Sequence, residues 1–180
     1  MTLREFYDMP WIGHEHPVLD LTNTVVIGAG PGHGDVDFLS DPGLTAAWRE
    51  RLGNRALARE PLGALRALRA PLRAAVDARA RGEQIPDRTR EELNTLAAGA
   101  PVTMRLGADG GLVHEEAADD VGAVLAREAL VLLAREGKER LRRCDAPSCG
   151  MYFLRTRRDQ AWCTVMCGNR ARAARRRPAS

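Results

Sequence analysis

All four cysteines of this 180-residue chain lie near its C-terminal end, at Cys144, Cys149, Cys163 and Cys167. The first two flank a tight turn, Asp145–Ser148, between short strands predicted over residues 141–144 and 151–154. The last two are spaced i, i+4, which puts them on one face of a first helical turn, and a helix is expected to begin near Gly168. A hairpin tip and a helix start can therefore bring four sulfurs to one point.

Four thiolates at one point favour a tetrahedral Zn²⁺ site, because thiolates are soft ligands and zinc needs no redox partner. The ligand spacing, C-x4-C followed by C-x3-C, is looser than that of paired C-x2-C motifs. Two disulfides, an iron–sulfur centre and ordinary core cysteines therefore remain open on the residues alone.

Charge is distributed unevenly along the chain. Residues 138–180 hold 12 of the 27 lysines and arginines but only three of the 24 acidic residues, a net charge of +9. The other 137 residues carry −6, although the whole chain has a formal charge of only +3. This asymmetry predicts an acidic body with a basic end that binds a polyanion.

The segment after Cys167 predicts a thin, arginine-rich helix that can enter a DNA major groove or lie along phosphates. A loop between the two cysteine pairs can add phosphate contacts. The alternatives to DNA binding are RNA binding, a protein contact and a solvated tail. For Asn169, the alternative to a base contact is a helix cap or a hydrogen bond in the zinc loop. The candidate nucleic-acid contacts are Arg155, Arg157, Arg158, Asn169, Arg170, Arg172, Arg175, Arg176 and Arg177.

Before the cysteines, apolar spacing predicts a mainly helical α+β domain. Helices are expected over residues 41–52, 61–81, 87–98 and 119–136, with a β-hairpin over 102–115. Pro71 is expected to kink or split the second of these helices. The segment Val18–Leu21 fits either a strand or a short buried helix.

Membrane and enzyme functions find little support in the sequence. The longest apolar run, residues 129–134, is far too short to span a membrane, and the N-terminus has no signal layout. We therefore expect a reducing, cytoplasmic location. A glycine-rich stretch resembles a dinucleotide-binding loop, but His33 stands where its third glycine is needed, and His14 and His16 lack metal-ligand spacing. We expect no enzymatic activity.

Two groups of motifs resemble known families. The segments 141–144, 162–163 and Cys167-Gly168-Asn169-Arg170 resemble the CGNR zinc finger, and Leu19–Thr24 together with residues 37–48 resembles the ABATE domain. The resemblance implies an ABATE-like helical body over 1–137 and, over 138–180, a four-cysteine zinc finger that is treble-clef-like, with a hairpin knuckle and a helix. It also implies that the four cysteines bind zinc and that the chain is a bacterial, stress-induced transcription regulator.

Two functions follow as hypotheses. One is a zinc-dependent, DNA-binding regulator whose N-terminal domain is a sensor or a dimerisation body. The alternative is a small-molecule-binding or protein-interaction protein in which the finger is purely structural. Asn23, Thr24 and Trp48 are candidates to line a ligand pocket, against core packing with satisfied polar groups. A homodimer and an unknown small-molecule effector are left open as partners besides DNA.

Overall fold

The computed structural model describes residues 16–29, 34–99, 101–116, 120–135 and 139–176. Helices predominate, and the strands described form three separate antiparallel pairs. The elements in chain order are α2 (Pro17–Thr22), β1 (Val25–Val26), β2 (Val36–Asp37), a 3-10 turn η2 (Phe38–Ser40), α3 (Pro42–Arg51), α4 (Arg55–Arg59), α5 (Leu62–Ala80), α6 (Asp87–Ala98), β3 (Val102–Leu106), β4 (Leu112–Glu116), α7 (Val121–Ala134), β5 (Leu141–Arg143), β6 (Tyr152–Leu154) and α8 (Val165–Arg176).

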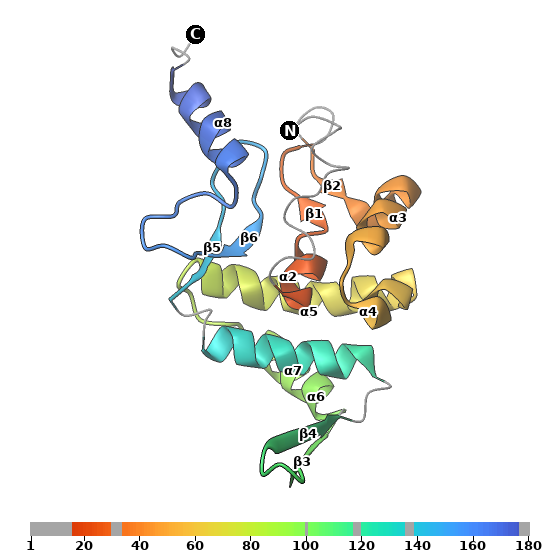
Figure 1. Cartoon of the computed structure of the whole chain (residues 1–180). Coiled ribbons are helices and arrows are strands. Elements are labelled where there is room, and N and C mark those ends of the chain that lie inside the picture. The colour runs from red at the N-terminus through yellow and green to blue at the C-terminus, as the bar shows by residue number, and fades with distance from the viewer. Residues whose placement is uncertain (1–15, 30–33, 100, 117–119, 136–138, 177–180) are drawn as a thin grey trace.

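Helix α5 crosses the middle of the molecule and separates two layers (Figure 1). Below it lie α6 and α7, and above it lie α2, the β1–β2 pair and the cysteine-containing segment. The helix is continuous through Pro71, which is buried, so the expected split does not occur. Helix α5 contacts α2, α6, α7, β5 and β6, and these neighbours hold both of its halves in place.

The predicted helices and hairpin of the lower layer are confirmed. Helix α7 begins at Val121, slightly later than expected, because the Asp120 side chain accepts a hydrogen bond from the Ala123 N–H and caps the helix. Strands β3 and β4 pair in the register Met104↔His114 and project from the bottom of the molecule in Figure 1.

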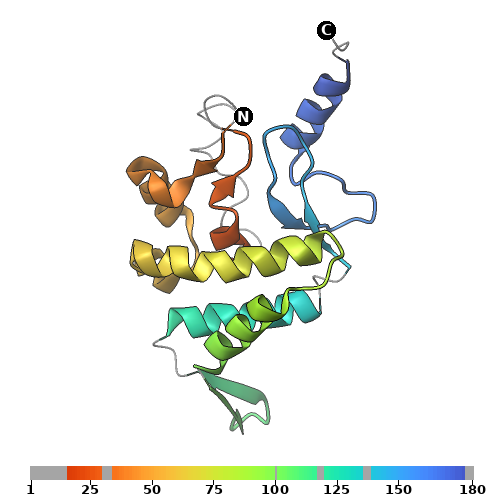
Figure 2. The same cartoon turned by 180° about the vertical axis from the view of Figure 1, so that it is seen from behind.

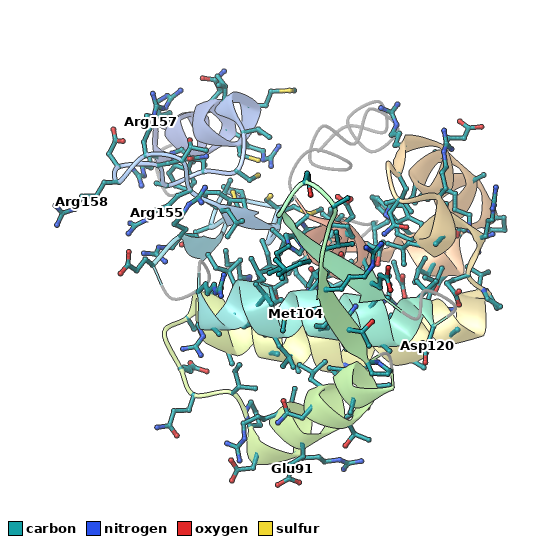
Figure 3. All side chains as sticks on the ribbon, turned by 60° about the horizontal axis from the view of Figure 1, so that its bottom comes forward. Glu91, Met104, Asp120, Arg155, Arg157 and Arg158 are labelled. Carbon is teal, nitrogen blue, oxygen red and sulfur yellow. The ribbon has the colours of Figure 1, made fainter. Side chains whose placement is uncertain are left out.

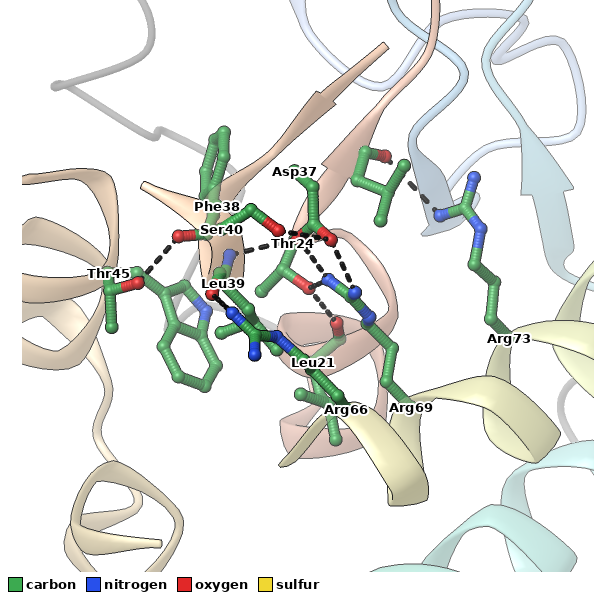
Figure 4. A network of polar contacts seen from close by, with 12 residues as sticks. Leu21, Thr24, Asp37, Phe38, Leu39, Ser40, Thr45, Arg66, Arg69 and Arg73 are labelled. Carbon is green, nitrogen blue, oxygen red and sulfur yellow. Dashed lines mark hydrogen bonds and ion pairs between the residues drawn. The ribbon is translucent and has the colours of Figure 1, made fainter. Parts of the chain in front are cut away.

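The ambiguous segment Val18–Leu21 is helical, within α2, and fully buried. Arginines that reach across from α5 hold the C-terminal end of α2 and the residues after it (Figure 4). Arg69 donates to both carboxylate oxygens of Asp37, at 2.5 and 2.7 Å, and to Thr24 Oγ1 at 2.9 Å. Burial alone would raise the pKa of Asp37, but the hydrogen bonds and charge of Arg69 outweigh burial and hold this pKa below its usual value.

The two predicted domains share one hydrophobic core. Leu141, Met151, Tyr152 and Phe153, from the C-terminal segment, belong to the same buried cluster as Leu72. The β5–β6 hairpin therefore packs against α5 and α2. Within the described residues, no helix combines the length and apolar character needed to cross a membrane.

Candidate metal centre

The four cysteine sulfurs converge as the spacing predicted, and all lie within 4.8 Å of one another. The Sγ of Cys149 lies 3.6 Å from those of Cys163 and Cys167, and the last two are 3.4 Å apart. Tetrahedral zinc with bonds of about 2.3 Å places its sulfurs about 3.8 Å apart, whereas a disulfide brings two sulfurs to about 2.0 Å. None of the four is in a disulfide. The donor set therefore fits Zn²⁺.

Crowding of the sulfurs changes their acidity. Hydrogen bonds from the Cys149 and Cys163 thiols lower the pKa of Cys144 to about 7. In turn, donation to Cys144 raises the pKa of Cys149 and of Cys163. The pKa of Cys144 is therefore lowered by the same hydrogen bonds that raise the pKa of the two thiols donating to it. A divalent cation replaces the thiol protons and neutralises the thiolates, which would otherwise repel one another.

Local hydrogen bonds shape the first cysteine pair. The Cys144 N–H donates to Met151 O at 2.8 Å, and the Gly150 N–H donates to Cys144 O at 3.1 Å. These two bonds close a knuckle between β5 and β6 and turn both cysteines inward. Ser148 within the turn has φ 55° and Gly150 has φ 69°, the left-handed conformation that such a turn requires.

The second cysteine pair lies at the start of α8. The helix begins at Val165, earlier than expected, because the Thr164 hydroxyl accepts a hydrogen bond from the Cys167 N–H at 3.1 Å. Cys167 is therefore in the first turn of α8, and Cys163 precedes the helix.

Arg170 joins the two halves of the centre. Its Nη2 donates to Cys167 Sγ at 3.2 Å, and its Nε donates to Pro147 O at 2.7 Å. A guanidinium at a ligand sulfur stabilises negative charge there and orients the ligand. Sequence reasoning proposed Arg170 only as a nucleic-acid contact and missed this role, which its i+3 position after Cys167 could have suggested.

Most of the other predicted nucleic-acid contacts lie at the surface on the same side of the molecule. Figure 3 shows Arg155, Arg157 and Arg158 together in the loop between β6 and α8. On α8, Arg172 donates to Asn169 Oδ1 at 2.6 Å, and Arg175 lies over the Trp162 ring at 5.8 Å. Of the remaining two predicted contacts, Arg176 lies in α8, where its side chain is not described, and Arg177 lies outside the described residues.

The three residues considered for a ligand pocket make internal hydrogen bonds, as the alternative of core packing with satisfied polar groups expects. Trp48 Nε1 donates to Asp20 O at 3.1 Å, and the Thr24 hydroxyl donates to Leu21 O at 2.7 Å. The Asn23 side chain donates to Tyr152 O at 2.9 Å and accepts from the Tyr152 N–H at 2.8 Å. Asn23 thus covers the outer edge of β6 as a third strand would, and it connects the helical body to the cysteine hairpin.

Gly150 is also essential to this junction. A Cβ built there would lie 2.9 Å from Ile27 Cγ1, and the Ile27 N–H donates to Cys149 O at 3.3 Å. We expect Gly150→Ala to destabilise the chain by about 3 kcal/mol, because an unfavourable positive φ adds to overpacking against Ile27. Urea unfolding followed by circular dichroism measures this change.

Gly82→Ala is the matched control, because Gly82 also has a positive φ but has open space around its Cβ position. It should cost only about 1 kcal/mol. Adding Ile27→Ala to Gly150→Ala should recover part of the difference. Equal losses for Gly150→Ala and Gly82→Ala would contradict the proposed contact.

Comparison with known families covers nearly the whole chain. A search of curated proteins found no match. The family model of the CGNR zinc finger matches residues 140–178, so the clustered cysteines belong to a finger whose family indicates zinc binding. The ABATE family model, described as "putative stress-induced transcription regulator", matches residues 15–136. The chain therefore belongs to the ABATE family and carries a C-terminal CGNR zinc finger.

Proposed function

We propose that this protein is a zinc-dependent DNA-binding transcription regulator that responds to stress, and that it acts by binding rather than by catalysis. Zinc would hold the knuckle and the start of α8 together through the four cysteines. The helix would then present its arginines to the phosphates or the major groove of DNA. The regulatory part rests on the description of the ABATE family. A homodimer and a cytoplasmic location stay predictions.

The observation that carries DNA binding is the concentration of exposed arginines in the finger, because residues 138–180 carry a net charge of +9 and the rest of the chain carries −6. In the body, Arg66, Arg69 and Arg73 reach inward and hold other segments, as Figure 4 shows. In the finger, Arg158 and Arg172 are exposed and make no ion pair with any residue that the structure describes. Their charge does not maintain the fold and is available to a polyanion.

The arrangement of α8 supports the same function. The helix stands away from the body at one end of the molecule (Figures 1 and 2). Gly168, in the CGNR tetrapeptide, allows the Trp162 ring to lie close, since a Cβ there would be 3.0 Å from Trp162 Cδ1. Trp162 in turn supports Arg175 through a cation–π contact. A fixed basic helix binds with less loss of conformational entropy than a tail does.

Replacing Arg172, Arg175 and Arg176 by alanine tests DNA binding. We expect the affinity for a short DNA duplex, measured by fluorescence anisotropy, to fall at least about tenfold near 0.1 M salt. The slope of log affinity against log salt should become shallower by about 2.7, because a protein with three fewer phosphate contacts releases fewer counterions when it binds.

The matched control removes three exposed body arginines, Arg55, Arg59 and Arg88, and so makes the same change in net charge. It should lower the affinity only slightly. Equal losses in both triple variants would mean that total charge, not α8, attracts DNA. No affinity of the zinc-loaded parent at low salt would overturn the proposal and favour a purely structural finger.

A further inference from the structure

A cavity of about 330 Å³, widely open to solvent, lies where the finger meets the body. One wall comes from Arg73 and Asp77 of α5 and from Arg81 directly after it, and the other from the finger, with Arg143 and Tyr152. Its size is within the range of small-molecule sites, about 300–1,000 Å³. The two walls come from segments far apart in the sequence, so the cavity exists only when the finger is seated on α5.

Cationic groups dominate the lining of this cavity. Among the described residues that line the cavity, the one carboxylate is Asp77, and it is already engaged: Arg81 lies 2.7 Å from its Oδ2, and the Tyr152 hydroxyl donates to its Oδ1 at 2.8 Å. Burial raises the pKa of Tyr152 to about 12, so this hydroxyl stays protonated and remains a donor. Three guanidinium groups against one carboxylate leave a net charge of +2.

Arg143 is the lining residue whose side chain the fold does not use. Its guanidinium makes no hydrogen bond or ion pair with any residue in the described ranges, although Arg143 is partly buried. Arg73 differs, because it donates to Thr22 O at 2.8 Å and lies over the Tyr152 ring at 5.3 Å. A partly buried guanidinium that faces two other cations is stabilised when an anion binds between them.

We propose that this cavity binds a small molecule carrying a phosphate group, with Arg143, Arg73 and Arg81 as its contacts. Guanidinium groups suit a phosphate because each can donate two parallel hydrogen bonds, and a dianion matches the net charge of the lining. The bound anion joins α5 to β5 and so holds the finger on the body. That the bound molecule acts as an effector of a regulator rests on the proposed function, whereas the binding site itself does not.

Inorganic phosphate is the probe for the first test, by calorimetric titration of the zinc-loaded chain without DNA. Arg143→Gln should weaken phosphate binding at least about tenfold, because a charged hydrogen-bonding partner is lost. Asp77→Asn should tighten it severalfold, because the one negative charge is removed. Arg88→Gln, an exposed arginine outside the cavity, is the matched control and should bind as the parent does.

Opposite effects of Arg143→Gln and Asp77→Asn, with Arg88→Gln unchanged, would support the site. The same phosphate affinity in Arg143→Gln as in Arg88→Gln, or no binding by the parent beyond a chloride control of equal ionic strength, would overturn it. A DNA duplex is the second probe. If DNA displaces phosphate and Arg143→Gln weakens DNA binding as much as Arg172→Ala does, the cavity belongs to the DNA surface and the proposal fails. A chain that binds phosphate but not DNA supports the site and contradicts only the proposed function.

Discussion

Replacing Cys163 and Cys167 by serine is expected to abolish zinc binding and to unfold α8 while the rest of the chain stays folded. Zinc supplies about 10–16 kcal/mol in isolated finger peptides, where it accounts for most of the folding energy. Here the β5–β6 hairpin is buried against the body, whereas among the α8 residues whose burial the structure describes, Val165 to Arg175, only Cys167, Gly168 and Ala171 are buried. The helix therefore depends on the metal, whereas the hairpin depends mainly on the shared core.

Metal analysis and hydrogen exchange measure the two parts of this prediction. Zinc content should fall from about one ion per chain to near zero, and amides of α8 should lose protection while those of α5 keep it. The matched control changes Val165 and Met166 to serine, because these neighbours are 79% and 52% exposed and are not ligands. Zinc retained by the cysteine variant would contradict the assignment of its ligands. Loss of protection throughout α5 would show instead that the body needs the metal.

The elements that depend on residues close together in the sequence were predictable. Helices α5, α6 and α7 and the β3–β4 hairpin follow from apolar spacing and turn residues, and the four cysteines from ligand chemistry. The start of α8 was misplaced because the Thr164 cap, a local signal, was not used. Pro71 does not divide α5, because tertiary contacts outweigh the lost hydrogen bond of a proline.

What the sequence could not show are contacts between residues far apart in the chain. Asn23 pairs with Tyr152 across 129 positions, and no local pattern distinguishes such an asparagine from one that lines a pocket. The same limit applies to Ile27, which explains the need for Gly150, and to the arginines that Figure 4 shows reaching across from α5. Each depends on how the layers stack, which only the completed fold defines.

Replacing Asn23 by alanine is expected to be the most damaging change in the body that leaves the apolar core intact. The variant would leave the N–H and the C=O of buried Tyr152 without the partners that they have in the chain. Each unsatisfied buried group costs about 1–3 kcal/mol, so we expect a loss of about 2–6 kcal/mol in the free energy of unfolding. The urea midpoint of the zinc-loaded chain measures this loss.

A control variant and a hydrogen-exchange measurement distinguish a role of Asn23 in connecting the finger to the body from general destabilisation. Asn94→Ala changes an exposed asparagine of α6 and should shift the urea midpoint by little. In Asn23→Ala, hydrogen exchange should increase first in β6, because the uncovered strand edge is exposed to water before the helices of the lower layer are. An unchanged midpoint, or β6 amides as protected as in the parent, would mean that zinc and the apolar core alone hold the finger on the body. The expected result would mean instead that the finger's position depends on a polar pair from the body, through which a change in the body can reach the basic helix.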